Sequence, residues 1–292
     1  MSDISLASFI LLAAAICAVW ARPVAIRRTA VPPWLALFLG ACVVGLAADV
    51  LRAPAIAALA ATGGAAWLTA RAPQQAVRVV FGVVTALLAV ALATHKLPGF
   101  NNPIVIKAVV LSDGALPFTQ YANFDKGAVG LIVLALLCDG GRTRAWGEFG
   151  AVLKRTLPVL LVTLVAVLGL AMASGAVRPD FKLTQLTMQF IAVNLFFTVV
   201  AEEAFFRGFL QQRLAESLAR WPCGKWFAVA VSALLFGAVH LAGGLPYALL
   251  ATVAGVGYAY CYHLTKRIEA PIMLHIALNA VHFVGFTYPA LR

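Results

Sequence analysis

Long apolar runs repeat along almost the whole chain. Ten of them are candidate membrane spans: residues 4–20, 34–51, 53–70, 77–94, 127–138, 157–177, 186–210, 226–241, 245–264 and 270–287. A bilayer core takes about 20 apolar residues per helix, whereas a transmembrane β-strand needs alternating polar and apolar residues. The runs here are continuous and rich in Leu, Ala and Val. They predict an all-α, polytopic transmembrane helix bundle of about 8–10 helices.

The composition excludes an ordinary soluble domain. Only 11% of the residues are charged and 63% are hydrophobic, whereas a soluble domain carries about 25% charged residues. Two spans are weaker than the others, because the third is rich in Ala and Gly and the fifth has only 12 residues. The loop 95–126, between the fourth and the fifth span, is long, and we expect a partly embedded segment around residues 104–111.

We explain the net charge of +11 by the membrane topology of the chain and not by a nucleic-acid partner. The basic residues cluster in short loops, as the positive-inside rule requires, and their distribution places both ends of a ten-helix chain outside. The five cysteines are scattered and make no CxxC pair, so we expect neither a disulfide framework nor a metal knuckle. The first residues, MSDISLASF, lack a basic n-region, which predicts a retained helix. The Ala-, Leu- and Val-rich composition suggests a multi-pass protein of a bacterial cytoplasmic (inner) membrane.

Polar residues inside the apolar runs divide the chain into two parts. Residues 1–150 have short spans and almost no such groups. We predict that they form N-terminal transmembrane helices, and we assign no role to them. Residues 151–292 carry nearly all of the unusual polar groups. We therefore expect the functional site in this second part, because an ionisable residue at membrane depth costs about 2.5–3.5 kcal/mol and is kept for a purpose.

The sequence AEEAFFRG, residues 201–208, places two carboxylates and an arginine within an apolar run. On a helix, Glu203 and Arg207 are four residues apart and share one face, which predicts an ion pair. Glu202 is left without a counter-charge on its own helix and is the better candidate for a working carboxylate. The alternative is that this is the cytoplasmic end of a helix, with both acids in water.

Histidines and an asparagine supply further polar groups. His240 follows Phe236 by one turn, and taken alone it is more often a packed, hydrogen-bonded residue than a ligand. His275 and Asn279 project from one helix face, and His282 leans the same way. Three polar groups on one apolar helix indicate a polar cavity, although interhelical hydrogen bonding explains them as well.

Together these residues form a hydrolytic set. A carboxylate beside a histidine activates water, and a second histidine and an amide stabilise an oxyanion. Alternatively, Glu202, His240 and His275 bind zinc and leave one position for water. The motifs HExxH and GxSxG are absent, and the second absence weakens a serine-nucleophile mechanism.

The same residues carry a family resemblance. The chain resembles the CAAX protease and bacteriocin-processing (CPBP, or Abi) family of intramembrane endopeptidases, which includes the type 2 CAAX prenyl protease. The motifs of this family are EExxxR, FxxxH and HxxxN, in that order. Here they read Glu202-Glu203-Ala-Phe-Phe-Arg207, Phe236-Gly-Ala-Val-His240 and His275-Ile-Ala-Leu-Asn279. Each motif is short, but three in order beside late hydrophobic helices are specific, and the resemblance covers about residues 150–292.

The resemblance implies a role for each residue. Glu202 would be the catalytic carboxylate with His240 helping to activate water, and His275 and Asn279 would line the oxyanion site. Glu203 and Arg207 would support the helix. The family is described both as metal-dependent and as glutamate-dependent without metal, and we favour the metal-free mechanism because no cysteine or second acidic ligand converges on the site. The expected partners are membrane lipid and a peptide or membrane-protein substrate.

A second interpretation is a non-catalytic membrane scaffold or a transporter. Intramembrane acids and histidines also build proton relays. A transporter often shows inverted repeats and helices broken at matching places, and this chain shows no such repeat. The polar groups gather in one half, which favours a single site over a transport path.

Overall fold

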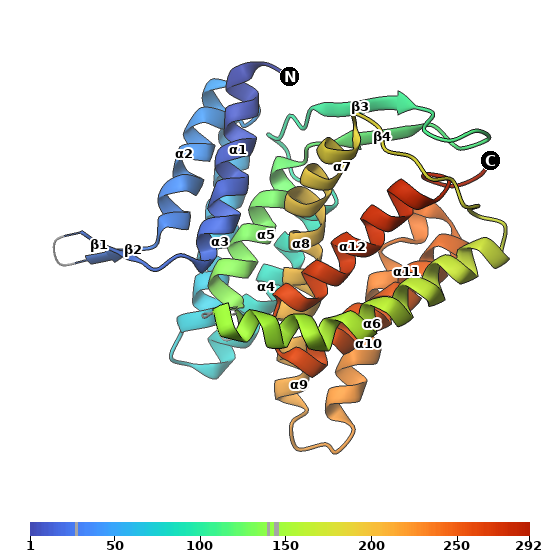
Figure 1. Cartoon of the computed structure of the whole chain (residues 1–292). Coiled ribbons are helices and arrows are strands. Elements are labelled where there is room, and N and C mark those ends of the chain that lie inside the picture. The colour runs from blue at the N-terminus through green and yellow to red at the C-terminus, as the bar shows by residue number, and fades with distance from the viewer. Residues whose placement is uncertain (27–28, 139–140, 143–145) are drawn as a thin grey trace. The chain divides into compact units, whose positions relative to one another are not determined.

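The chain folds into helices over most of its length (Figure 1). The structure is a computed structural model and describes residues 1–26, 29–138, 141–142 and 146–292. It contains two compact units: unit 1 consists of Met1–Val105, Tyr121–Gly140 and Phe196–Phe205, and unit 2 of Ile106–Gln120, Gly141–Leu195 and Phe206–Arg292. The predicted division into residues 1–150 and 151–292 rests on where polar residues occur and not on compact units, and it stays a prediction.

Each of the ten apolar runs forms a helix, which confirms the all-α class. The helices are α1 (Asp3–Cys17), α2 (Pro33–Ala47), α3 (Ala53–Arg71), α4 (Gln75–Ala93), α5 (Phe124–Leu137), α6 (Trp146–Ala173), a run from α7 (Thr187–Asn194) to α9 (Gln212–Ser217), α10 (Gly224–Ala238), α11 (Leu245–Thr265) and α12 (Glu269–Gly285). Proline occupies the first turn of α2, α3 and α11, where its missing N–H costs nothing.

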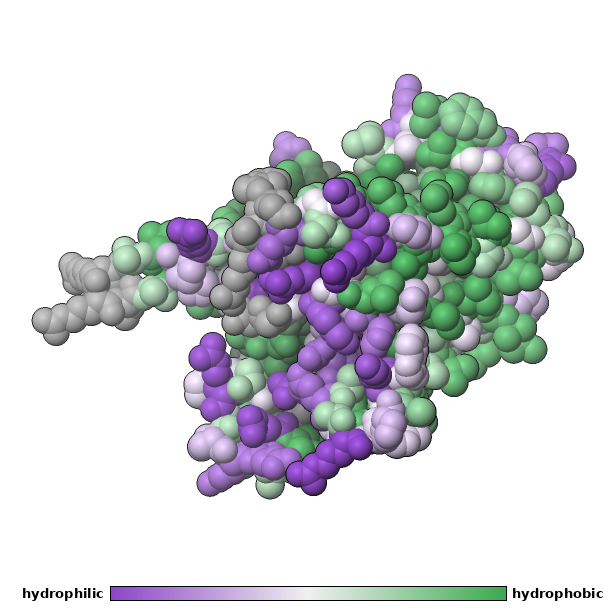
Figure 2. Space-filling view, turned by 60° about the horizontal axis from the view of Figure 1, so that its bottom comes forward, coloured by the Kyte–Doolittle hydropathy of each residue, from purple (hydrophilic) through white to green (hydrophobic). Residues whose placement is uncertain are grey.

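Large apolar side chains cover much of the outer surface. Among the described residues, five helical stretches are long and apolar enough to cross a membrane, namely Asp3–Trp20, Ala53–Arg71, Gln75–Ala93, Glu148–Ala173 and Thr187–Ser217. Val162 and Val165 of α6 are 71% and 75% exposed, and Leu87 of α4 is 66% exposed. Figure 2 shows wide areas of such hydrophobic side chains on the visible face. Apolar surface of this extent requires lipid around it, so the chain is an integral membrane protein.

Unit 1 is built around the short helix α5. This helix packs against α1, α3, α4 and α8 (Val200–Glu203), and almost all of its residues are buried. Phe9 of α1 places its ring edge against Phe124 of α5, with 5.7 Å between the ring centroids. The short hairpin of β1 (Val24–Ile26) and β2 (Thr29–Val31) connects the region after α1 to α2. Because neighbours surround α5, it stays stable with only 14 residues.

A glycine allows α5 to approach α8 closely. A Cβ atom on Gly130 would lie 2.7 Å from the Cα atom of Ala201, which is backbone and cannot turn aside. Ala201 directly precedes Glu202, so this contact fixes the backbone position from which the Glu202 side chain extends. Gly64 of α3, in contrast, has nothing within 4 Å of its Cβ position.

We expect Gly130→Ala to destabilise the protein by about 1–3 kcal/mol, because overpacking a close helix contact forces the backbone to shift. Gly64→Ala is the matched control and is neutral or stabilising, since alanine is the better helix former. Thermal unfolding of both variants in the same detergent measures the difference. Equal melting temperatures would show that α5 and α8 are not packed this closely.

Unit 2 contains the later helices and a second hairpin. Helix α11 packs against α6, α10 and α12, and α12 also packs against α6 and α7. The rings of Phe190 and Phe283 stack with 4.1 Å between their centroids, and Ile106 completes this buried cluster. The segment around residues 104–111, expected to be partly embedded, contains strand β3 (Ile104–Val109), which pairs with β4 (Phe118–Tyr121).

Candidate active site

The EExxxR motif lies on one continuous helical run that contains two π-helical segments. The run extends from Thr187 to Ser217. It is π-helical at η3 (Leu195–Val199) and η4 (Ala204–Gln211), and the four-residue α8 lies between them. Glu202 and Glu203 lie in α8, and Arg207 lies in η4. The regular α-helix assumed from the sequence is therefore wrong locally, and π-helical turns of this kind are frequent at functional sites.

Glu202 has a cationic partner that its own helix does not supply. The Nζ atom of Lys126, at the start of α5, donates to Oε1 of Glu202 over 2.7 Å. The side chains of Lys126 and Glu202 are only 16% and 13% exposed. The prediction from the sequence, that Glu202 has no counter-charge on its own helix, did not include this partner. It considered only the neighbours along one helix, and Lys126 is 76 residues away in the sequence.

A polar network holds the start of α5, and with it Lys126. The carboxylate of Asp125 is 1% exposed and accepts hydrogen bonds from Nδ1 of His95 over 2.7 Å and from Nδ2 of Asn102 over 3.0 Å. The backbone N–H of Phe124 donates to Oδ1 of Asn102 over 2.8 Å. His95, at the start of the long loop 95–126, thus contacts the residue next to Lys126. These bonds fix the lysine that faces Glu202.

Arg207 is fully buried among aromatic rings of unit 2. Its guanidinium carbon lies 4.5 Å from the ring centroid of Phe236 and 5.2 Å from that of Tyr258. One of its N–H groups donates to the carbonyl oxygen of Gly255 over 3.2 Å. Glu203 is also fully buried, and its ion pair with Arg207 stays a prediction. The arginine of the first motif therefore packs directly on the phenylalanine of the second.

We expect Arg207→Lys to lower the free energy of unfolding by about 2 kcal/mol, since a lysine has neither the planar face nor the donor fork that these contacts use. Arg213→Lys, on an exposed position of α9, is the matched control and should unfold like the parent. Chemical unfolding in detergent checks both variants. Equal losses in the two variants would contradict the buried role of Arg207.

His240 lies in the turn that follows α10, not within the helix as expected. Its Nδ1 atom is 2.6 Å from the carbonyl oxygen of Phe236. A carbonyl oxygen only accepts, so Nδ1 carries a proton, and the neutral form of the ring has its lone pair on Nε2. The turn ends at Gly244, whose φ of 95° and ψ of 160° are available to glycine alone. The backbone thus sets both the place and the tautomer of His240.

His275 and Asn279 are held by neighbours on other elements of unit 2. The His275 ring is 5% exposed and stacks on Tyr258 with 4.4 Å between the ring centroids. It also meets the edge of Phe236 at 5.7 Å. Nδ2 of Asn279 donates to Oδ1 of Asn194 over 2.8 Å. Asn279 therefore makes an interhelical hydrogen bond, the alternative to a polar cavity.

Phe236 is the point where the three motifs converge within unit 2. Arg207 lies over its ring, and the rings of His240 and His275 are 4.7 and 5.7 Å from its centroid. The helical run that brings Arg207 to this point also carries Glu202, five residues earlier. In the part of the chain that the structure describes, no three His, Cys, Asp or Glu side chains form a group that could hold a metal ion. Zinc binding by Glu202, His240 and His275 stays a prediction.

Three residues that contact the motif side chains were not predicted from the sequence, namely Lys126, Tyr258 and Asn194. Lys126 ends a long loop in the sequence and looks solvated, although the preceding Asp125 and the motif LPGFNNP marked the region as unusual. Tyr258 lies in the apolar run of α11 with nothing to distinguish it from a core residue. Asn194 sits inside a span, and its amide was the one available signal.

Comparison with known proteins agrees with this geometry. Residues 184–281 match the family model of the type II CAAX prenyl endopeptidase, Rce1-like. This segment contains all three motifs. Residues 184–281 are therefore similar to this family, and we refer to this similar segment as the Rce1-like domain.

A bacterial protein is also similar to part of this chain. The chain is 30% identical over 113 residues to "Putative membrane peptidase YdiL" of Bacillus subtilis (strain 168), and the match covers 39% of this chain and 43% of that protein. The chain thus spans less than half the length of the curated relative that it matches. No solved structure matches this chain. Lys126 lies outside the Rce1-like domain, in a part of the chain that the family model does not describe.

Proposed function

We propose that this protein is an intramembrane endopeptidase that hydrolyses peptide bonds of a membrane-associated peptide or protein. The observation that carries the proposal is the convergence on Phe236 of Arg207, His240 and His275, one from each motif of the Rce1-like domain. Polar residues that only stabilise the fold would not be expected to follow the three motifs of this family in order.

In the proposed reaction, Glu202 removes a proton from a water molecule whose oxygen attacks the carbonyl carbon of the substrate. His240 accepts a hydrogen bond from this water at Nε2, the ring nitrogen that its backbone contact leaves unprotonated. The carbonyl oxygen becomes an oxyanion, which His275 and the second Nδ2 hydrogen of Asn279 stabilise. The proton then passes to the amide nitrogen as the C–N bond breaks, and Glu202 returns to its carboxylate beside Lys126.

The substrate class follows from the surroundings of the site. Apolar helices surround the residues, so a substrate reaches them most readily from the bilayer. We propose a short peptide or a membrane-protein segment in a bacterial cytoplasmic membrane, and we favour peptide processing over maturation of prenylated proteins. The rings around Phe236 exclude bulk water, and the polar side chains admit the few molecules that the reaction needs.

The proposal is tested with the full chain purified in detergent and a panel of fluorogenic membrane peptides, including one with a prenylated CAAX end. His240→Ala is compared with the parent, and the metal content of both is measured. Cleavage by the parent and its loss in a folded His240→Ala protein support the peptidase. If zinc is present in the parent and lost from His240→Ala, a metal-dependent mechanism replaces the metal-free one.

The scaffold or transporter interpretation makes the opposite prediction. It requires that no peptide of the panel is cut and that substitution of the motif residues changes only stability. Proton uptake by the parent in sealed vesicles, absent from His240→Ala, would favour the transporter and overturn the proposed peptidase.

A further inference from the structure

A groove runs between α6 and α11, both in unit 2. Its volume is about 800 Å³ and its walls are mostly apolar, with Pro158 and Val162 on one side and Val256 and Tyr260 on the other. The two helices meet closely where a Cβ atom on Gly257 would lie 2.2 Å from Oγ1 of Thr163. This volume lies within the range of binding pockets for small molecules.

The groove opens to the side of the helices, where lipid lies. Val162 is 71% exposed and Val256 is 49% exposed, although both line the groove. Helix α6 belongs to the stretch Glu148–Ala173, one of the most apolar spans of the chain. An open apolar channel on a membrane-spanning helix is shaped for a hydrocarbon chain and not for water.

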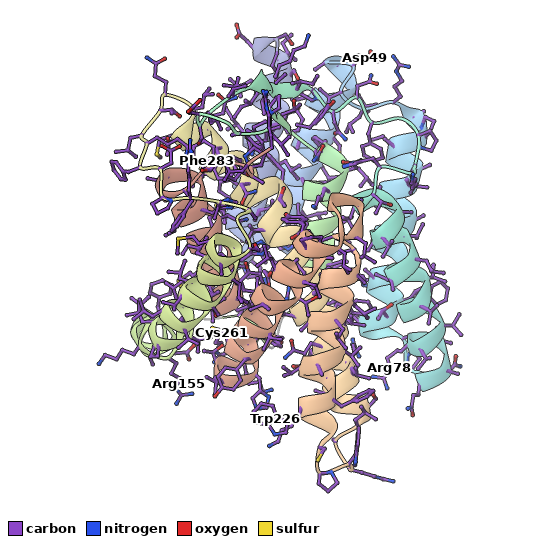
Figure 3. All side chains as sticks on the ribbon, turned by 90° about the vertical axis from the view of Figure 1, so that its right-hand side faces the viewer. Asp49, Arg78, Arg155, Trp226, Cys261 and Phe283 are labelled. Carbon is purple, nitrogen blue, oxygen red and sulfur yellow. The ribbon has the colours of Figure 1, made fainter. Side chains whose placement is uncertain are left out.

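One end of the groove is basic. Arg155 lines it and donates from its guanidinium to the carbonyl oxygen of Leu264 over 3.4 Å, at the carboxyl end of α11. Lys266 caps the same helix two residues later. In Figure 3, Arg155 and Trp226 both lie toward the lower end of the helices that carry them.

Trp226 lies at the basic end of the groove, and a third cation, Lys225, is its neighbour in the sequence. The ring of Trp226 stacks on Tyr260 with 6.1 Å between their centroids and lies 4.8 Å from His263. Trp226 is half exposed, as is typical of a ring at the level of lipid headgroups. Lys225 precedes it directly in the first turn of α10. The beginning of α10 and the end of α11 thus place Lys225 and Lys266 near each other.

These cations have no acidic partner among the described residues. No ion pair with a described carboxylate is formed by Arg155, Lys225 or Lys266, and the nearby Glu148 lies 3.4 Å from Arg267 instead. Burial lowers the pKa of Lys266, and repulsion by Lys225 lowers it further. A cluster of like charges beside an apolar groove is therefore complementary to a ligand that carries both an anion and a hydrocarbon chain.

We propose that this groove binds an anionic phospholipid, with one acyl chain between α6 and α11 and its phosphate among Arg155, Lys225 and Lys266. The planar fork of an arginine matches phosphate oxygens, and lysines add point charges. The site is separate from the motif residues and does not depend on the proposed peptidase activity. Each cation close to an anionic headgroup favours binding about fivefold.

The experiment uses the full chain reconstituted in vesicles of phosphatidylcholine and phosphatidylglycerol in equal amounts. The protein is extracted in a mild detergent, and the lipid that remains bound is identified by native mass spectrometry. We expect retention of one phosphatidylglycerol in preference to phosphatidylcholine. The variant R155Q/K225Q/K266Q should reduce this preference about 100-fold, the product of three fivefold effects.

Matched variants separate the headgroup from the groove. Arg78→Gln removes an exposed charge at the start of α4 and should retain lipid like the parent. Val162→Trp fills the groove and should expel the acyl chain, whereas Val165→Trp, equally exposed on α6 but outside the groove, should not. Equal retention of both lipids, or equal behaviour of R155Q/K225Q/K266Q and R78Q, would overturn the proposal. A protein dimer that carries no lipid and is lost in Val162→Trp would identify a second copy of this chain as the occupant instead.

Discussion

Glu202→Gln lowers the rate of peptide cleavage by about 10²–10⁴-fold, the usual contribution of a general base. The amide has nearly the shape of the carboxylate but takes no proton from water at neutral pH, so substrate binding should change much less than turnover. The measurement is the cleavage rate of the purified variant on the peptide that the parent cuts best, with kcat and KM determined separately.

The control for this substitution lies on the same helical run. Glu216→Gln removes an exposed carboxylate of α9 and should retain the activity of the parent. If Glu202→Gln cleaves as fast as Glu216→Gln, then Glu202 is not the base and the roles assigned to the motif are wrong. Comparison at a temperature below the melting point of each variant keeps loss of fold apart from loss of chemistry.

Lys126→Met has the second large effect, and it acts first on stability. Removing one member of a largely buried ion pair leaves the other charge without compensation, and we expect a loss of about 3 kcal/mol in the free energy of unfolding. Activity should also fall, because the 2.7 Å contact that orients Glu202 is gone. Unfolding in denaturant and the cleavage rate are measured on the same sample.

The double variant Lys126→Met/Glu202→Gln distinguishes the two effects. With both charges removed, the stability should return close to that of the parent, while cleavage should remain abolished. A double-mutant cycle over the four proteins gives the coupling between the side chains. Additive losses would show that Lys126 and Glu202 do not interact, and Lys126 would then have no positioning role.

The helices were largely readable from the sequence, because length and apolar composition suffice to define a membrane span. Helix α3, expected to be weak, has 19 residues, and α5 is short because neighbours bury it on nearly all sides. The π-helical segments η3 and η4 were not readable. They depend on packing around the run from Thr187 to Ser217, which no local sequence pattern encodes.

The candidate residues come from the sequence and stay predictions, and the sequence did not indicate the side chains that contact them. The spacing within each motif indicated Glu202, His240, His275 and Asn279. The contacts of Glu202 with Lys126 and of Asn279 with Asn194 join residues 76 and 85 positions apart, so only the fold brings them together. The contact of His240 depends on the turn that follows α10, which brings its ring to the carbonyl oxygen of Phe236, where the sequence suggested a continuous helix.

The order in which the chain threads its two units has a consequence for biosynthesis. Unit 1 includes Phe196–Phe205, which leaves the ribosome after Gly141–Leu195 of unit 2. Lys126 therefore has no Glu202 carboxylate to pair with until the intervening residues are synthesised. Unit 1 cannot complete its core as an independent early domain, which is the usual route for a nascent protein. A nascent chain stalled before residue 196 should be a substrate for quality control, because neither unit is then complete.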